Sequence, residues 1–287
     1  MQNYIELLSD VMSNGVDRPD RTGIGTRSVN GRLLRWDLQQ GFPIITSRRV
    51  SLKIAFEETM FFLRGNSNTK LLEEKNINIW RGNTSREFLD ARGLTHLPEG
   101  DMGRGYGVQW RHWRTNENSE VDQIDNLLSG IKSDPYGRRH VVTGWNPGEL
   151  DQMALPPCHM MQLYTVNGEF TVGDGKLNSC FIMRSNDVPF GLPYNIMSYA
   201  LLNHIFAKHL GMVPGELVYM GWDVHIYHNQ FDMVNEQLTR TPRALPRLHI
   251  DKNLGTIDDI MSLEWSDIRL EGYDPHPDIA SKPKMAV

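Results

Sequence analysis

The stretch NIMSYALLNHIFAKHL, residues 195–210, decides the fold of this chain. Apolar residues lie on nearly all sides of a helix drawn through it, and a helix that is apolar all round has to be buried. The segments around it have the composition of strands: KLNSCFIMR (176–184) precedes it, and ELVYMGWDVHIYHNQ (216–230) follows as a strand that runs into a helix. We therefore predict a buried central helix that packs against a sheet.

Further elements flank this core on both sides. HMMQLYTV (159–166) and RHVVTGW (139–145) predict strands, and Asn167-Gly168 is a strong hairpin signal between 159–166 and 176–184. Residues 81–105 are rich in Gly, Arg and acids, which predicts an excursion over the surface. Three amphipathic patterns predict helices: Tyr4 to Met12, residues 51–64 with Ser51 as N-cap and Gly65 as stop, and residues 122–134.

Composition limits the class of protein. The chain has 287 residues, 39% of them hydrophobic and 23% charged, which is enough to bury a full core. Its net charge of −5 argues against a surface that coats nucleic acid. Two cysteines make no disulfide framework, the N-terminus does not have the pattern of a signal peptide, and no long apolar window predicts a membrane span. Without an internal repeat or linker, we predict one domain, residues 1–287, working in the reducing cytoplasm.

The segment ALPPCHMMQLY (154–164) places a thiol where a turn enters a strand. Two prolines fix φ and remove two backbone donors, so Cys158 sits on a rigid corner of the kind that holds nucleophiles. Free cysteine is also among the most buried residue types, so a packed thiol is the competing interpretation. Cys180, in the middle of a predicted strand, is expected in the core.

Two neighbouring glutamates occupy different stripes of the 51–64 helix. Glu57 shares its stripe with Lys53 and Arg64 and is expected in solvent, whereas Glu58 shares the apolar stripe that includes Phe61. A carboxylate on an apolar stripe is costly unless it is paired or functional. Burial would raise its pKa toward the range of a general acid, and a pairing with an arginine is the structural alternative.

Several polar residues lie at turns and strand ends. Guanidinium groups in such places suit phosphate, although each can equally form a surface salt bridge. The planar amide of Asn195 offers the donor and acceptor that a uracil edge needs. No Cys/His cluster has metal-ligand spacing, and we predict no metal. The residues in question are Arg21, Arg138, Arg139, Arg184, Asp187, Asn195, His225 and Tyr227.

The sequence resembles the thymidylate synthase family along nearly its whole length. The motifs that carry the resemblance are DRTGIGT, FFLRGNSNTKLLEEKNINIW, EGDMGRGYGVQWRHW, DPYGRRHVV, ALPPCH, RSNDVPFGLPYNI, SYALL, DVHIYHNQ and the tail EGYDPHP with KMAV. The resemblance implies a single α+β domain, with a mixed sheet packed against helices around the buried helix. It also implies a homodimer, dUMP as acceptor and 5,10-methylenetetrahydrofolate as one-carbon donor.

The resemblance also implies roles, carried over by position. Cys158 would add to C6 of the pyrimidine, which makes C5 a carbon nucleophile. Glu58 would relay protons through water, and Tyr106 would help to remove the C5 proton. Substrate-binding residues would be Arg21, Arg184, Ser185, Asn195, His225 and Tyr227, with Arg138 and Arg139 donated across the dimer. Residues at the folate would be Trp80, Asn83, Asp187, Gly191 and Val287, with Asp187 also counted as catalytic.

Three positions depart from the family's pattern. Met183 replaces the usual Gln before Arg-Ser, Arg81 replaces an acid after the tryptophan, and Trp222 takes a usually small position. The stretch MRSNDV also resembles a branch that hydroxymethylates dUMP by adding water to the same intermediate. Trp80 and the KMAV tail, which shield that intermediate, favour methylation to dTMP with release of dihydrofolate. An inactive nucleotide-binding regulator is expected to lack Cys158, Glu58 or Tyr106, which this chain retains.

Overall fold

The structure is a computed structural model that describes residues 1–287 except 118, 171–173, 282 and 284–287. Among the described residues, a six-stranded sheet in the order β1-β2-β8-β7-β6-β5 forms the centre of the fold. Its neighbouring strands are antiparallel except for β7 and β8, which are parallel. The strands of this mixed sheet are β1 (Val16–Arg18), β2 (Thr26–Asp37), β5 (Val141–Thr143), β6 (His159–Asn167), β7 (Lys176–Asp187) and β8 (Val213–Tyr227).

The predicted central helix is α7 (Gly191–His209), and it is the crossover that joins the parallel strands β7 and β8. Parallel neighbours need such a crossover, which explains why this segment determines the topology. Its buried residues include Leu201, Leu202, Ile205 and Phe206, which lie against the sheet and α2 (Leu52–Leu63). Burying each such side chain contributes about 1.5–3 kcal/mol. The α+β class and the mixed sheet against helices are confirmed.

The helix α2 begins after Ser51, whose backbone is extended, although the Ser51 side chain makes no capping hydrogen bond. Gly65 has φ +72°, and its N–H and that of Asn66 donate to the carbonyls of Phe62 and Phe61. This double hydrogen bond is the Schellman arrangement that ends a helix with a glycine. The predicted start and stop of this helix are therefore correct.

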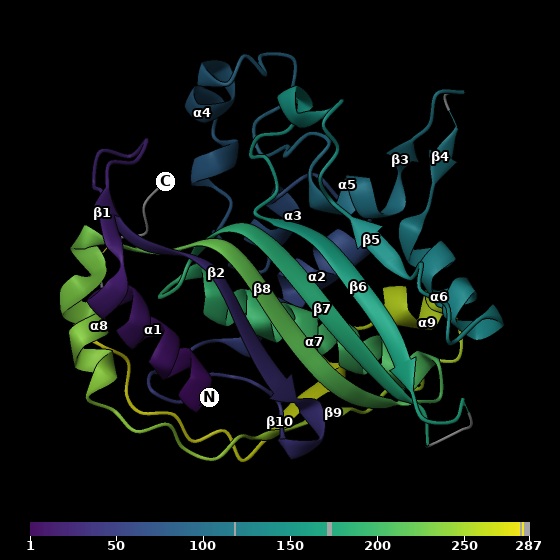
Figure 1. Ribbon diagram of the computed structural model, residues 1–287. Coiled ribbons are helices and arrows are strands. Elements are labelled where there is room, and N and C mark those ends of the chain that lie inside the picture. Colours follow the sequence, from purple (N-terminus) through teal and green to yellow (C-terminus); the bar gives the residue numbers. More distant parts are fainter. Residues whose placement is uncertain (118, 171–173, 282, 284–287) are drawn as a thin grey trace.

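The remaining helices lie around the sheet and at one end of it. In Figure 1 the sheet crosses the front of the molecule with α2 and α7 behind it. The predicted helices near the N-terminus and at 122–134 are confirmed as α1 and α6. The bounds are α1 (Gln2–Asn14), α3 (Lys70–Glu73), α4 (Arg86–Ala91), α5 (Tyr106–Arg111), α6 (Gln123–Ser133), α8 (Phe231–Leu238) and α9 (Ile257–Met261). Two small two-stranded antiparallel sheets pair β3 (Trp113–Arg114) with β4 (Glu120–Val121), and β9 (Arg247–Ile250) with β10 (Ile268–Glu271).

The predicted hairpin is present, with a longer connection than a tight turn. Strands β6 and β7 pair antiparallel from His159↔Met183 to Asn167↔Lys176. Gly168 follows β6 with φ +80°, and β7 starts only at Lys176. The strand predicted at 139–145 shortens to the three residues of β5, whereas 216–230 forms β8 followed by a turn into α8.

The two faces of the sheet differ in burial. Along β7, Leu177, Phe181 and Met183 are buried against α7, whereas Cys180 and Ile182 are only partly buried on the opposite face. The expectation that Cys180 lies in the core is wrong for the single chain, because the period of two in a strand turns it away from α7. Large apolar side chains on this outer face are exposed: Leu33, Val141, Met220 and Trp222.

The predicted excursion, residues 81–105, is more than a surface loop. It contains α4, and its Leu89 and Leu94 are buried with Ala154 in a small cluster of their own, against which Leu97 packs. In Figure 1 α4 stands above the end of the sheet. No helix in the described part of the chain is long and apolar enough to cross a membrane.

Candidate active site

The corner that carries Cys158 is held from two sides. Its backbone N–H donates to the hydroxyl oxygen of Tyr106 on α5 at 2.9 Å. Arg184 on β7 donates from Nε to the carbonyl of Pro157 and from Nη2 to that of Pro156, each at 2.9 Å. The same Nη2 lies 3.8 Å from the Cys158 Sγ. The two prolines and these contacts fix the position of a partly buried thiol.

Burial dominates the electrostatics of this thiol, and the net effect raises its pKa. Burial raises the pKa of Cys158, while the positive charges of Arg184 and Arg21 lower it. Two cations at a buried thiol favour the thiolate, which is the nucleophilic form. The two guanidinium groups beside this thiol oppose the effect of burial, and the packed-thiol interpretation does not explain their presence.

A cavity of about 570 Å³ opens over this corner. Residues from the loop before β2, from α5, from the start of β6 and from the ends of β7 and β8 meet there, because these strand ends lie side by side. Predicted site residues that line the cavity are Arg21, Trp80, Tyr106, Cys158, Arg184, Ser185, Asp187, His225 and Tyr227.

Part of the cavity wall was missed by the sequence reasoning. Leu155 and Pro156 lie beside Cys158, and Phe88, Ala91 and Arg92 come from the α4 region. The apolar residues Phe88, Leu89 and Ala91 within the polar segment 81–105 could have indicated that α4 packs against the site. A second depression of about 640 Å³ lies around Arg49, Tyr194 and Tyr273, and none of the predicted site residues lines it.

Glu58 points from α2 to the tryptophan of the cavity. Trp80 Nε1 donates a 2.7 Å hydrogen bond to Glu58 Oε1. Burial raises the pKa of Glu58 to about 7, and the Trp80 N–H acts in the opposite direction. A carboxyl that titrates near neutral pH is suited to give and take protons. The structural alternative, a buried ion pair with an arginine, is not what the structure shows for this residue.

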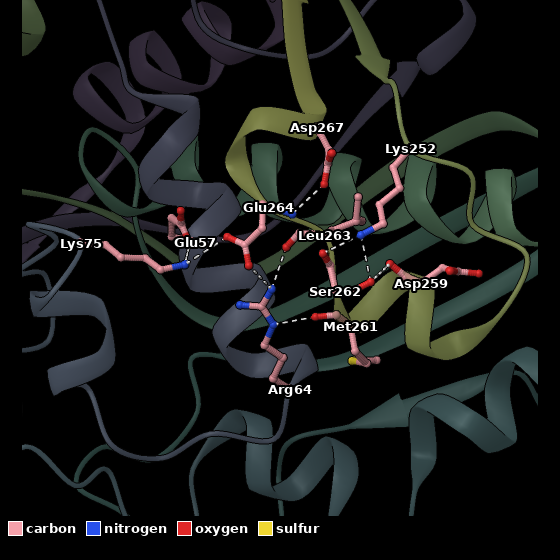
Figure 2. A network of polar contacts seen from close by, with 10 residues as sticks. All are labelled: Glu57, Arg64, Lys75, Lys252, Asp259, Met261, Ser262, Leu263, Glu264 and Asp267. Atoms are coloured by element: carbon pink, nitrogen blue, oxygen red, sulfur yellow. Dashed lines mark hydrogen bonds and ion pairs between the residues drawn. The ribbon is translucent and has the colours of Figure 1, made fainter.

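The expectation that Glu57 lies in solvent is wrong. Its side chain is only 4% exposed, and its Oε2 lies 2.6 Å from Nζ of Lys75 (Figure 2). Glu57 is the more buried of the two glutamates, since Glu58 is partly exposed, and Lys75 from the segment after α3 covers the stripe on which Glu57 lies. A stripe faces solvent only where nothing else packs on it, and the local pattern does not contain that information.

Below the cavity lies a neutral histidine. His159 stacks on Tyr106 with ring centroids 4.1 Å apart, and its Nδ1 lies 2.6 Å from the hydroxyl of Tyr199. Burial lowers the pKa of His159 to about 3, so the ring is uncharged at neutral pH. Met183, the residue in place of the usual glutamine, is buried opposite His159 on the neighbouring strand. Its thioether offers only a weak acceptor at this place.

Asp187 lies at the end of β7. Its carboxylate accepts from the Phe190 N–H at 3.1 Å and from Gln230 Nε2 at 3.0 Å. Burial raises the pKa of Asp187, and His225 lowers it. On β8, burial raises the pKa of Tyr227 to about 12, so its phenol stays protonated and able to donate.

Asn195 and Gly191 lie beside each other on the first turns of α7. The Oδ1 of Asn195 accepts from Asn186 Nδ2 at 3.3 Å, and Asn186 Oδ1 accepts from the Tyr219 hydroxyl at 3.1 Å. This chain of hydrogen bonds orients the Asn195 amide and leaves its own Nδ2 to donate elsewhere. A Cβ at Gly191 would lie 3.8 Å from both Asn195 and Asp187, which places Gly191 between them.

Asn83 follows the tryptophan of the cavity in the segment 80–84. Its Nδ2 is buried and has no hydrogen-bond partner among the described residues. An unpaired buried donor costs free energy unless a ligand or water satisfies it.

Six described residues of the predicted site do not line the cavity: Glu58, Asn83, Arg138, Arg139, Gly191 and Asn195. Arg138 and Arg139 are exposed in the loop before β5 and do not line it. Val287 and the KMAV tail lie outside the described residues. Among the residues that the structure describes, no group of three or more His, Cys, Asp or Glu side chains is placed to hold a metal ion.

The comparison with known families agrees with the motifs and the fold. The family model described as thymidylate synthase matches residues 2–287, nearly the entire chain. The mixed sheet, the buried crossover helix and the cysteine corner all lie within this match. The chain belongs to the thymidylate synthase family.

Proposed function

We propose that the protein transfers a one-carbon unit from 5,10-methylenetetrahydrofolate to C5 of dUMP and releases dTMP and dihydrofolate. The observation that carries the proposal is a cavity at which a thiol and two cations meet, beside an indole that holds a carboxyl with a pKa of about 7. Cys158 lies at the corner, Arg21 and Arg184 lie beside it, and Glu58 lies behind Trp80. We also propose that residues 1–287 act as one catalytic domain.

The first step would be covalent. The Cys158 thiolate adds to C6 of the pyrimidine, an S–C6 bond forms, and the electrons of the C5–C6 double bond move toward C5 and O4. Arg21, Arg184 and Ser185 would hold the phosphate, since guanidinium forks match its oxygens. His225 and Tyr227 would hold the ribose hydroxyl from the end of β8. Asn195 would read the uracil edge through its free Nδ2 and its Oδ1.

Proton transfer would follow at C5 and O4. Glu58, with its pKa of about 7, can exchange protons with water at the pyrimidine near neutral pH. Tyr106 touches the Cys158 backbone and faces the same cavity, so it would orient the acceptor of the C5 proton. Loss of that proton and cleavage of the S–C6 bond would release the product and restore the thiol.

The folate would lie over the pyrimidine. When bound, it supplies the one-carbon unit and, for methylation, the hydride that reduces it. Trp80 offers an aromatic wall to the cavity, and the unpaired Nδ2 of Asn83 offers a donor for a polar group of the ring system. Asp187 and Gly191 would border the folate and pyrimidine, and Val287 would close over them.

We propose that the protein is a homodimer whose subunits exchange arginines. The outer sheet face exposes Leu33 (48%), Met220 (41%) and Trp222 (64%), and large contiguous apolar surfaces on globular proteins mark interfaces. A second copy on this face would also bury Cys180. Arg138 and Arg139 are exposed outside their own subunit's cavity, as residues that serve the partner's phosphate site would be. The free thiol that catalysis needs suits the cytoplasm as the place of action.

The second candidate function is hydroxymethylation of dUMP. The specific observation in its favour is Met183, which is buried beside His159 and lacks the amide that would hold water near Glu58. In this branch water adds to the exocyclic carbon, where the synthase adds hydride. Trp80, which lines the cavity and shields this region, supports methylation.

One experiment separates these functions. The enzyme is incubated with dUMP and methylenetetrahydrofolate, the nucleotide product is weighed by mass spectrometry, and dihydrofolate is followed by absorbance. We expect dTMP and an absorbance rise. A product heavier by one oxygen, with tetrahydrofolate, would establish the hydroxymethylase, and binding without either product would leave a nucleotide-binding regulator. Deleting Val287 should then reduce methylation more than dUMP binding.

A further inference from the structure

Two consecutive glutamates of α2 hold two points of one short segment. Glu57 binds Lys75 Nζ at 2.6 Å, and Glu58 accepts from Trp80 Nε1 at 2.7 Å. Lys75 and Trp80 are separated by only four residues. The position of the Trp80 indole relative to Glu58 is therefore tied to the position of Lys75 relative to Glu57.

Backbone hydrogen bonds hold the start of the segment between these anchors, where the N–H groups of Asn76 and Ile77 donate to the carbonyls of Glu73 and Leu72 at 2.8 and 2.9 Å. The segment leaves α3 through Asn76, which has φ +61°, a conformation that asparagine tolerates but that most side chains avoid. Asn76 and Asn78 are exposed, and Ile77 and Trp80 supply the buried apolar contacts. These contacts fix the course of the backbone, and the polar contacts of Lys75 and Trp80 add a constraint on the two side chains that face Glu57 and Glu58.

The ion pair between Glu57 and Lys75 is more buried than the pair between Glu73 and Arg81, which flanks the same segment. Glu57 is 4% exposed and Lys75 is 35% exposed, whereas Glu73 and Arg81 are 26% and 63% exposed. A buried carboxylate that loses its partner is strongly destabilised, but an exposed pair is screened by water and contributes little. The Glu73–Arg81 pair is therefore a natural control for the Glu57–Lys75 pair.

The same ion pair is part of a wider network that spans α2 (Figure 2). Lys75 Nζ lies 3.8 Å from Glu264, and Arg64 Nη2 lies 3.5 Å from the same side chain. Arg64 also donates to the carbonyls of Met261 and Leu263 at 2.8 and 2.6 Å. Glu264, in the segment after α9, thus gives Lys75 a second acidic neighbour in addition to Glu57.

We propose that Glu57 and Lys75 are positioning residues that hold the Trp80 indole on the Glu58 carboxylate. They touch neither substrate and act through Trp80. The proposal rests on the proposed function only in assigning a catalytic use to Glu58, because the geometry of the Glu58–Trp80 hydrogen bond can be measured without turnover.

The test uses four variants of the full chain. Glu57→Met removes the anchor and leaves Lys75, already partly exposed, free to turn to water. Lys75→Arg keeps the ion pair, Glu73→Gln removes the exposed pair as a matched control, and Trp80→Phe removes the indole itself. The indole N–H resonance of Trp80, assigned by its absence in Trp80→Phe, reports the hydrogen bond in a ¹H–¹⁵N spectrum.

We expect Glu57→Met to move the Trp80 resonance toward that of a solvated indole and to lower kcat about ten-fold with little change in the KM for dUMP. Lys75→Arg should keep the resonance at its wild-type position, and Glu73→Gln should leave it unmoved and kcat within about two-fold. Adding Glu57→Met to Trp80→Phe should lower kcat no further, because both changes act through one hydrogen bond.

An unmoved resonance in folded Glu57→Met, or additive effects in the double variant, would overturn the proposal. If Glu57→Met does not fold, Lys75→Gln replaces it, since glutamine still donates one hydrogen bond to the buried carboxylate. A moved resonance in a protein that turns over no dUMP would contradict the proposed function and leave the positioning intact.

Discussion

The phenolic oxygen of Tyr106 accepts a 2.9 Å hydrogen bond from the backbone N–H of Cys158. The contact joins α5 to the corner of β6, so the residue proposed for proton removal and the proposed nucleophile share one rigid arrangement. The N–H occupies a lone pair of the phenol and leaves its proton for another partner in the cavity. Burial raises the pKa of Tyr106 well above 10.0, so the phenol acts in its neutral form.

Tyr106→Phe should slow removal of the C5 proton while dUMP still binds. The variant loses the hydroxyl that orients the acceptor of that proton, and such groups contribute typically 10²–10⁴-fold. Tritium release from 5-tritiated dUMP measures the step, and calorimetry measures the affinity for dUMP. Tritium release at the wild-type rate would exclude Tyr106 from this step.

Cys158→Ser should nearly abolish turnover. A serine hydroxyl is a far weaker nucleophile than a thiolate at neutral pH, while the corner and the cations Arg21 and Arg184 remain in place. Steady-state assays should show less than roughly a tenth of the wild-type rate, with dUMP binding retained. A variant above that rate would mean that no S–C6 bond is required.

Glu58→Gln should change how stability depends on pH. The folded protein keeps the Glu58 proton up to about pH 7, whereas the ordinary pKa of a glutamate, which applies in the unfolded chain, is 4.5. The free energy of unfolding that Glu58 contributes therefore falls as the pH rises from about 4.5 to about 7 and stays low above it. Glutamine has no charge to bury. The free energy of unfolding of the variant, relative to that of wild type, should therefore rise by about 1–3 kcal/mol between pH 4 and pH 8.

Urea unfolding of both proteins at pH 4, 6 and 8 measures this difference. If the free energies of unfolding of wild type and Glu58→Gln differ by the same amount at all three pH values, Glu58 is already ionised in the folded protein at acid pH. The activity of the variant should fall at every pH, since the amide cannot exchange protons with water.

Asn195→Asp should shift preference from dUMP toward dCMP. Uracil offers N3–H and O4, whereas cytosine offers an unprotonated N3 and an amino group, which a carboxyl can satisfy better than an amide. The Asn186 amide next to position 195 can still donate to the new carboxyl. Competition between the two nucleotides gives the ratio of kcat/KM, and an unchanged ratio would remove Asn195 as the reader of the base.

Mixed dimers should regain activity. If Arg139 serves the partner's site, a heterodimer of Cys158→Ser and Arg139→Ala subunits contains one site with both residues intact. Mixing the two inactive variants under conditions of subunit exchange should restore up to about half of the activity per complementing dimer. Sedimentation as a monomer, or mixtures that stay inactive, would contradict shared sites.

The locally periodic elements were predictable from their residues. The apolar surface of 195–210 required burial, and Gly65 ended α2 by a local backbone arrangement that depends only on nearby residues. The largest omission is β2 (Thr26–Asp37), whose arginines and glycine interrupt the expected alternation. It is held in the sheet by eleven residue pairings with β8, and such long-range pairing leaves little trace in the sequence of one strand.

The sequence by itself determined the family, the cysteine corner and the residues that could carry the chemistry, because motifs and turn residues act over a few positions. Tertiary structure decided what those residues contact. It buried Glu57 under Lys75, gave Glu58 the indole of Trp80, turned Cys180 away from α7 and left Arg138 and Arg139 outside their own cavity. Burial and pairing depend on segments far apart in the chain, so the same carboxylate or guanidinium takes its charge state and its partner from the fold.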